Sequence, residues 1–376
     1  MAPMGCKARK PGLFRSCGTH CLVSRCCGRH LEHAIAPAAR PHGRLLHYRR
    51  PACLRAFASR RGRSPPILRA ACRIGVFLGA TLAACSSPVP VEGSAREPRI
   101  WDIRGARFVG ESQLVAALAD ARYRLLGEVH DNPAHHEIRA RLIIAIAAAG
   151  ARPAVVLEQF DLERDQDLIA AQAAGADAEQ LAKAGQLDRK SWGWPLHKPI
   201  LEAALALHLP IRAGNLTRAQ LSGDLQAAAE KDSNAIWYAR LHAARWTEAQ
   251  AAELRADIVE SHCNKLPETI VPRLALAQRM RDATMAQALV NGATTGGAIL
   301  IAGNGHVRAD LAVPVYLHAT GLPDADARSV SLGLIEVSPE DERAGDFPRQ
   351  VIADHPGFNY VWFTPPAARE DPCKSL

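Results

Sequence analysis

Short continuous runs of apolar residues recur along the chain from residue 100, and longer segments of helical periodicity separate them. The runs cover 100–103, 123–127, 153–160, 209–215, 298–306, 330–337 and 359–364. Apolar runs of this length between turn residues are typical of strands that are buried on both faces. Strands that alternate with helices predict an α/β fold, with a mostly parallel sheet flanked by helices.

The segments between these runs are predicted to be helical, and one of them is long. The shorter helices cover 111–121, 136–149, 162–174, 178–184 and 199–208. Asn132 can cap the second of these helices with Pro133 at the first helical position, where a missing N–H costs nothing. The stretch 216–291 is almost wholly helical in pattern and too large for a single crossover, so it predicts an inserted helical subdomain beside the sheet.

Polar side chains stand at the ends of three of the predicted strands. Glu128 and His130 follow the first, Glu158 ends the second, and His306 follows the third. Because parallel strands end at the same edge of a sheet, where α/β proteins bind ligands, we expect these side chains to converge. They can bind a divalent metal, with Glu128, His130 and His306 as ligands, or serve as a general acid and base without one. The structural alternative is a set of hydrogen-bonded polar groups at strand ends.

Charged residues and cysteines divide the chain near residue 85. Residues 1–84 hold 16 of the 46 Lys and Arg residues but one of the 38 acidic residues. The remaining 30 basic and 37 acidic residues give the body a net charge of −7, which leaves no case for a nucleic-acid partner. Eight of the ten cysteines lie at or before Cys85, so the body predicts no disulfide framework. Cys263 is expected to be a buried or helix-end cysteine, because no Gly-rich elbow accompanies it.

The leader predicts a lipid-anchored protein of the cell envelope. Residues 60–84 join a basic flank to an apolar run too short to span a bilayer, as in a signal peptide. The run ends in Leu-Ala-Ala-Cys, which resembles a bacterial lipobox with Cys85 as the lipidated mature N-terminus; an ordinary cleaved signal is the alternative. No Asp follows at the second position, which favours the outer membrane, facing the periplasm. Residues 85–99 are then a tether. Residues 1–59 reflect either a start codon assigned too far upstream or a disordered extension.

The motifs of the body resemble those of the ChaN-like haem-binding lipoproteins of the TIKI/TraB/erythromycin-esterase-like superfamily. The paired Gly-x-x-His motifs 127–130 and 303–306 carry the superfamily resemblance. The ChaN-like pieces are 127–136, 156–160, Trp192-x-Trp194 with Pro199-Ile200, 213–216, 261–263, 277–286 and 313–317. The resemblance covers roughly residues 100–320, so the predicted domains are a ChaN-like α/β domain at 100–340 and a C-terminal strand and tail at 341–376.

This resemblance implies a periplasmic protein that binds haem or an iron complex and takes part in haem or iron uptake. Some members are similar to a haem-stacking homodimer in which each iron takes a tyrosine ligand, so a homodimer is expected. Tyr238 is our candidate ligand, because it shares a helix face with His242 and tyrosinate is a known haem ligand; core packing is the alternative. His135 and His136 are further candidates for cofactor binding. Covalent haem attachment is excluded by the absence of Cys-x-x-Cys-His.

The superfamily's hydrolases imply a rival function, a metal-dependent or His/Glu-dependent hydrolase of peptides or esters. Carried over by position, the catalytic residues are Glu128, His130, Glu158 and His306. Asp282, next to Arg281, either supports this site or belongs to a helix-surface ion pair. A structural or partner-binding lipoprotein with a vestigial site is the third alternative.

Overall fold

The computed structural model describes residues 99–231, 241–242, 244–319, 328–338 and 357–374. These residues belong to one compact unit that begins at Ser87. The predicted signal peptide, Cys85 and Tyr238 lie outside the described residues. No helix in the described part of the chain is both long enough and apolar enough to cross a bilayer.

The centre of the unit is an eight-stranded sheet with the order β2-β1-β8-β7-β3-β6-β4-β5. The strands from β8 to β5 run parallel, whereas β1 and β2 add to one side in antiparallel fashion. The bounds are β1 Ile100–Asp102, β2 Arg107–Val109, β3 Tyr123–Leu126, β4 Ala154–Asp161, β5 Ile211–Asn215, β6 Ala298–Ile301, β7 Ser329–Glu336 and β8 Tyr360–Thr364. The α/β fold class predicted from the apolar runs is confirmed.

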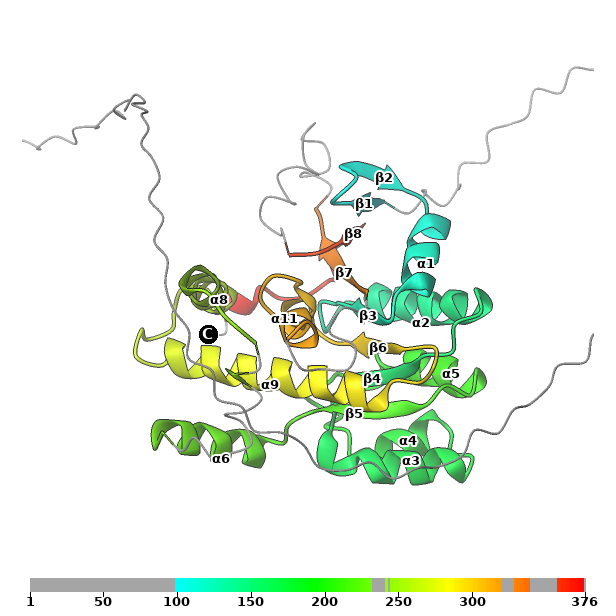
Figure 1. Cartoon of the computed structure of the whole chain (residues 1–376), viewed down its shortest axis with the longest axis horizontal. Coiled ribbons are helices and arrows are strands. Elements are labelled where there is room, and N and C mark those ends of the chain that lie inside the picture. Colours follow the sequence, from blue (N-terminus) through cyan, green and yellow to red (C-terminus); the bar gives the residue numbers. More distant parts are fainter. Residues whose placement is uncertain (1–98, 232–240, 243, 320–327, 339–356, 375–376) are drawn as a thin grey trace, which may run out of the picture. The chain divides into compact units, whose positions relative to one another are not determined.

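Helices cover both faces of this sheet (Figure 1). One face packs against α1 Glu111–Asp120, α2 Pro133–Ala148, α3 Asp165–Ala173, α4 Ala178–Ala184 and α5 Lys198–Ala206. The other packs against α9 Val271–Gly292 and α11 Val313–Leu317, with α6 Arg218–Ala229 beside α9. The remaining helical segments are η1 Leu162–Arg164, α8 Glu248–Ser261, α10 Asn304–Val307 and η2 Pro372–Lys374.

Side chains that point alternately to the two faces of the sheet explain why both faces are apolar and buried. In β6, Ile299 and Ile301 face the α2 side, while Ala298 and Leu300 face α9, and all four are fully buried. Successive side chains of a strand point to opposite faces, so a sheet covered on both sides needs apolar residues at every position. The continuous apolar runs of the sequence therefore mark the central strands.

The long helical run forms part of the sheet's own cover. Its last helix, α9, packs along β4, β5 and β6, as Figure 1 shows, and α8 packs on α9. The loops that follow β3 and β6, together with the carboxyl end of β4, meet at one edge of the sheet, because these strands are parallel neighbours. We call this edge the carboxyl edge.

Candidate functional site

The first Gly-x-x-His motif places a carboxylate and an imidazole together just beyond β3. Glu128 is buried, and its Oε1 lies 2.8 Å from Nδ1 of His130. The His130 side chain is 46% exposed, and its ring lies edge-on to Trp192 at 5.1 Å. Because Nδ1 donates to the carboxylate, Nε2 is the nitrogen that remains available to a ligand or a substrate proton.

Glu128 is the centre of a buried polar network that the sequence analysis did not find. Arg139 of α2 donates to Glu128 Oε2, and the Arg139 side chain has no exposed surface. His197 and Gln159 approach Oε1 at 3.4 Å each. Arg139 follows His136 by one helical turn on a largely apolar helix face, which is the signal that could have identified it. His197 stands immediately before α5 and carries no comparable signal.

The second motif supports a separate buried cluster that links β4, α9 and α10. His306 Nε2 lies 3.3 Å from Glu158 Oε1, and its Nδ1 lies 2.6 Å from Asp282 Oδ1. The other Glu158 oxygen accepts a hydrogen bond from the backbone N–H of Gly303 at 2.8 Å. Asp282 is fully buried and contacts His306, while Arg281 donates to Asn215. Asp282 and Arg281 therefore do not form a helix-surface ion pair, and Asp282 supports the His306 cluster.

The two clusters differ in the charge of their buried histidines, which are His306 in one cluster and His136 and His197 in the other. Burial favours neutral His306, but the charges of Glu158 and Asp282 outweigh it and raise the pKa of His306 to about 10. Burial would raise the pKa of Glu158, and the His306 charge lowers it instead. Burial also raises the pKa of Asp282 to about 6, against the attraction of His306. At neutral pH the cluster is therefore an imidazolium between two carboxylates.

His136 and His197, which lie beside Glu128, are neutral by comparison. Burial lowers the pKa of His136 to about 4, and it lowers the pKa of His197 still further. The nearby cation Arg139 already compensates the charge of Glu128, so these rings gain nothing from a second proton. His197 Nδ1 has no hydrogen-bond partner among the described residues.

Each motif glycine makes room for the other motif. A Cβ on Gly127 would lie 2.2 Å from Oδ1 of Asn304, and one on Gly303 would lie 2.8 Å from Nε2 of His130. The Asn304 N–H also donates to the Glu128 carbonyl at 2.9 Å. The two Gly-x-x-His loops therefore interlock, and this close approach explains the glycine at the start of each motif.

His135 and His136 have both ring nitrogens engaged inside the protein. His135 Nδ1 accepts from the Val129 N–H, and its Nε2 lies 2.7 Å from Oγ1 of Thr364. His136 Nε2 donates to the His130 carbonyl, and its Nδ1 contacts Arg139. Both rings are buried, so contact with a cofactor would require breaking these hydrogen bonds. Their role in cofactor binding stays a prediction, and this geometry favours a role in holding the His130 loop.

The predicted metal ligands do not form one ligand set. Glu128 and His130 are adjacent, but both nitrogens of His306 are protonated donors to Glu158 and Asp282. The group whose ligand atoms lie within 4.8 Å of one another is Glu128, His136 and His197. Arg139 already donates to the first and contacts the second, so a cation would have to displace a buried guanidinium. This donor set does not fit a resident divalent metal.

The two predicted haem-ligand residues lie in or next to the segment 232–240, which is outside the described residues. Tyr238 lies outside the described residues, and His242, in the short stretch that follows, is exposed. The described tyrosines do not replace it. Tyr123 is buried in the core, Tyr316 is buried with a pKa raised by burial to about 12, and burial raises the pKa of Tyr360 in β8. For Tyr316 and Tyr360 the raised pKa disfavours the phenolate that iron would bind.

A cavity of about 590 Å³ lies beside the interlocked loops, between α8, α10 and the ends of β3 and β7. Its volume is within the range of small-molecule sites, roughly 300–1,000 Å³. Val129, Ile335 and Phe358 supply apolar walls. Gly305 and six polar residues complete the lining: Asp257, Glu260, Ser261, Asn304, Arg308 and Glu336.

Comparisons with known proteins agree with this architecture. A solved structure of cofacial haem binding to ChaN of Campylobacter jejuni is similar, with a TM-score of 0.56 and 19% identity over 71% of this chain and 97% of that chain. The type III effector HopBA1 matches at a TM-score of 0.32, with 13% identity over 66% and 88% of the two chains. A MARTX toxin effector domain, RRSP of Vibrio vulnificus, matches at 0.34, with 15% identity over 61% and 37%. At these identities the matches speak to fold alone, and the last two are too distant to carry an argument.

No curated protein matches the chain. The family model described as haem-binding uptake, Tiki superfamily, ChaN matches residues 114–317, which is more than half of the sequence. The matched segment runs from α1 to α11 and contains both Gly-x-x-His motifs, Glu158 and Asp282. This protein belongs to the ChaN family of haem-binding uptake proteins within the Tiki superfamily.

Proposed function

We propose that this protein is a lipid-anchored periplasmic protein that binds haem and takes part in haem or iron uptake. The observation that carries the proposal is the family match over residues 114–317. The solved ChaN of Campylobacter jejuni, which shares the fold, binds haem cofacially. Cofacial binding of this kind by the present chain would require two copies, and a homodimer is part of the proposal.

The compartment is supported by two independent features. The Leu-Ala-Ala-Cys sequence at 82–85 is a lipobox pattern, with Cys85 as the lipid-bearing residue. In the body, Cys263 and Cys373 form a disulfide. Disulfides persist in oxidising compartments such as the bacterial periplasm and are rare in the cytosol. The prediction that the body has no disulfide framework, made because it holds only two cysteines, is therefore wrong for this pair.

Among the described residues, His130 meets the requirements of an iron ligand. Its Nδ1 is fixed by Glu128, which orients the ring and leaves Nε2 as the available nitrogen. The half-exposed ring stands next to Trp192, an aromatic surface on which a flat macrocycle can pack. Haem would supply the iron and its own redox chemistry, while the chain holds the ligand and one apolar wall. Tyr238 remains the predicted tyrosine ligand.

Haemin titration of the full chain tests this function. We expect a shifted Soret band that saturates, together with dimerisation in sedimentation at the same haemin concentrations. Loss of the shift in Tyr238→Phe would assign the tyrosine, and loss in His130→Ala would assign the histidine. The absence of any saturable shift would reject haem binding by this chain.

Anchoring is tested separately by labelling with a radioactive fatty acid. The full chain should incorporate the label and sediment with the outer membrane. A Cys85→Ala variant should do neither, and label retained in that variant would reject the lipobox assignment.

A second function is favoured by one specific observation. The Glu128–His130 pair is a carboxylate-oriented imidazole with an accessible Nε2, as a general base requires. Hydrolysis of an ester or peptide would use Nε2 to take a proton from water. Turnover of model esters that disappears in His130→Ala would support this alternative, and unchanged turnover in that variant would reject it.

A further inference from the structure

The C-terminal tail runs along the carboxyl edge and contacts the loop that bears His130. After β8 ends at Thr364, the Pro365 carbonyl accepts from Asn132 Nδ2 at 3.1 Å. The Ala367 N–H donates to Glu336 Oε1 at 3.0 Å. Arg369 then pairs with Asp131 at 2.8 Å and with Glu336 at 2.5 Å. Two residues next to His130, Asp131 and Asn132, are therefore tied to the tail.

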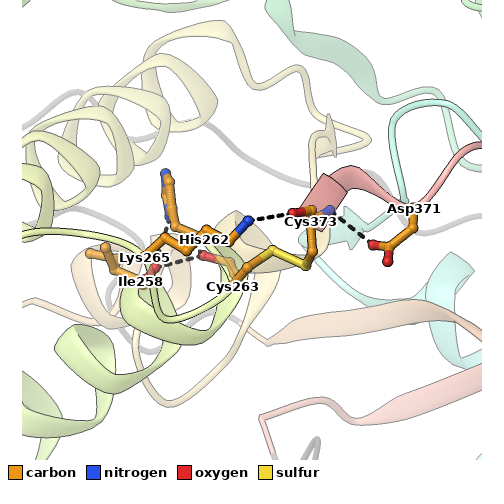
Figure 2. The surroundings of a disulfide bond; sticks show 7 residues. Ile258, His262, Cys263, Lys265, Asp371 and Cys373 are labelled. Atoms are coloured by element: carbon orange, nitrogen blue, oxygen red, sulfur yellow. Dashed lines mark hydrogen bonds between the residues drawn. A yellow bond between two sulfur atoms is a disulfide. The ribbon is translucent and has the colours of Figure 1, made fainter. Parts of the chain in front are cut away.

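The far end of the tail is attached covalently to α8. Cys373 forms a disulfide with Cys263, which lies 110 residues earlier and directly follows the helix end (Figure 2). Lys265 Nζ donates to the Cys373 carbonyl at 2.5 Å, and the Cys373 N–H donates to Asp371 at 2.9 Å. Both cysteines are half-buried, so the bond is within reach of solvent.

The end of α8 carries a conformation that glycine usually adopts. The Asn264 N–H bonds the Val259 carbonyl and the Cys263 N–H bonds the Glu260 carbonyl, which is the Schellman arrangement. Cys263 occupies the left-handed position of this motif with φ 60°. A residue with a Cβ is strained there, so its sulfur, and not its backbone, accounts for a cysteine at this position.

The two attachments of the tail lie on opposite walls of the 590 Å³ cavity. Glu336 belongs to the strand wall, while Glu260 and Ser261, the last residues of α8 before Cys263, belong to the helix wall. The tail itself does not line the cavity. Residues 365–374 therefore connect the two walls from outside, and the disulfide closes this connection.

We propose that residues 365–374 form a redox-released strap that fixes the loop of His130 and the width of the adjacent cavity. In the oxidised state the disulfide, the Arg369 pairs and Asn132 hold the strap on both walls. A dithiol reductant opens it by thiol–disulfide exchange: one thiolate attacks a cystine sulfur, a mixed disulfide forms, and the second thiol resolves it. Two electrons and two protons pass to Cys263 and Cys373, and the reductant becomes a disulfide.

The remaining contacts of the strap are not covalent and can open reversibly. Arg369 donates to both oxygens of Glu336, and the two side chains are 27% and 14% exposed, so this pair is within reach of water. The structure thus places a reducible bond where its loss frees the end of the tail from α8 and leaves the tail's contacts with Asp131 and Asn132 of the His130 loop able to open.

Hydrogen exchange of the full chain tests the strap without any ligand. On adding dithiothreitol, we expect exchange to rise about tenfold or more in peptides covering 365–374 and 129–133, and at the end of α8, as local opening predicts. Peptides from β4, Ala154–Asp161, should stay protected and so report that the fold is intact. Cys373→Ser without reductant should reproduce the pattern.

A double variant, Cys263→Ser with Cys373→Ser, is the matched control. It should show the open pattern at once and should not respond to dithiothreitol, which excludes effects of the reductant on other cysteines. Unchanged exchange at 129–133 in the reduced chain would overturn the proposal. The probe for the proposed function is separate: if haemin binds neither redox form, haem binding fails, while the exchange data still decide the strap.

Discussion

The carboxyl edge of the sheet is held together in two ways on its two sides. On one side lies the buried centre, which we define as Glu128, Arg139, Glu158, Asp282 and His306. All five residues are less than 10% exposed, and their charges are paired within the protein. On the other side the strap uses the partly exposed pairs of Arg369 and a disulfide.

This difference shows how burial decides what an ion pair contributes. Removing one partner of a buried pair leaves an uncompensated charge in a poor solvent, whereas an exposed partner regains water. The buried centre therefore needs no covalent bond to keep its geometry. The strap has one, which attaches the tail to α8 in addition to the partly exposed pairs of Arg369.

The largest effect that we expect is the loss of Arg139. Arg139→Met leaves Glu128 buried without its cation, which should lower the free energy of unfolding by about 3–5 kcal/mol. Arg141→Met, two residues along the same helix, removes an exposed pair with Glu111 and should cost about 1 kcal/mol or less. Urea unfolding of both variants measures the difference. Equal losses of unfolding free energy in the two variants would show that burial does not set the contribution of these ion pairs.

The pH dependence of stability separates the charged and neutral histidines. The folded pKa of His306, about 10, lies above its unfolded value, so its contribution is complete below about pH 6.5 and is lost as the pH rises toward 10. The free energy of unfolding should fall by up to about 1.4 kcal/mol per pH unit in this window. Stability that is constant or rising between pH 7 and 9 would contradict the imidazolium at His306.

Below about pH 6.5 the free energy of unfolding should instead fall as the pH falls. Burial lowers the folded pKa of His135 and His136 to about 4, so their contribution is present above about pH 6.5 and is lost as the pH falls toward 4. Asp282, with a pKa raised to about 6, offsets part of this slope. His135→Gln should flatten the acid limb and leave the alkaline limb unchanged, which urea unfolding at several pH values can measure.

The sequence was sufficient to locate the carboxyl edge and much of the buried centre. The apolar runs that end at Glu128, Glu158 and His306 predicted strands, and parallel neighbours bring their ends together. Asn132 caps α2 and Pro133 begins it, as the local pattern predicted. These features are local, or follow from the rule that parallel strands end at one edge.

Partners from distant elements could not be predicted in the same way. His197 approaches Glu128 from the residue before α5, and no spacing in the sequence connects the two. The disulfide joins cysteines 110 residues apart, and neither lies in a recognisable pattern. The short strand β2 was also missed, because Arg107 and Phe108 are exposed and give no buried run. Long-range pairing depends on the whole topology, which local pattern does not specify.

A smaller effect is expected where the two motif loops interlock. Gly303→Ala would place a Cβ 2.8 Å from His130 Nε2, so the ring must move, at a cost of about 1–3 kcal/mol. Gly305→Ala is the control, because its Cβ would meet nothing closer than Gln278 at 3.7 Å. Urea unfolding and the imidazole NMR signals of His130 measure both consequences. An unmoved His130 ring in Gly303→Ala would argue against the interlock.

The smallest effect concerns the end of the strap and separates its bond from its backbone. Cys263→Ala and Cys263→Gly both remove the disulfide, but only glycine relieves the left-handed conformation at this position, φ 60°. The glycine variant should therefore be more stable than the alanine variant by about 1 kcal/mol. If the two variants unfold at the same urea concentration, the end of α8 has rearranged without the bond. In that case the disulfide shapes the helix end, and the Schellman motif does not exist independently of it.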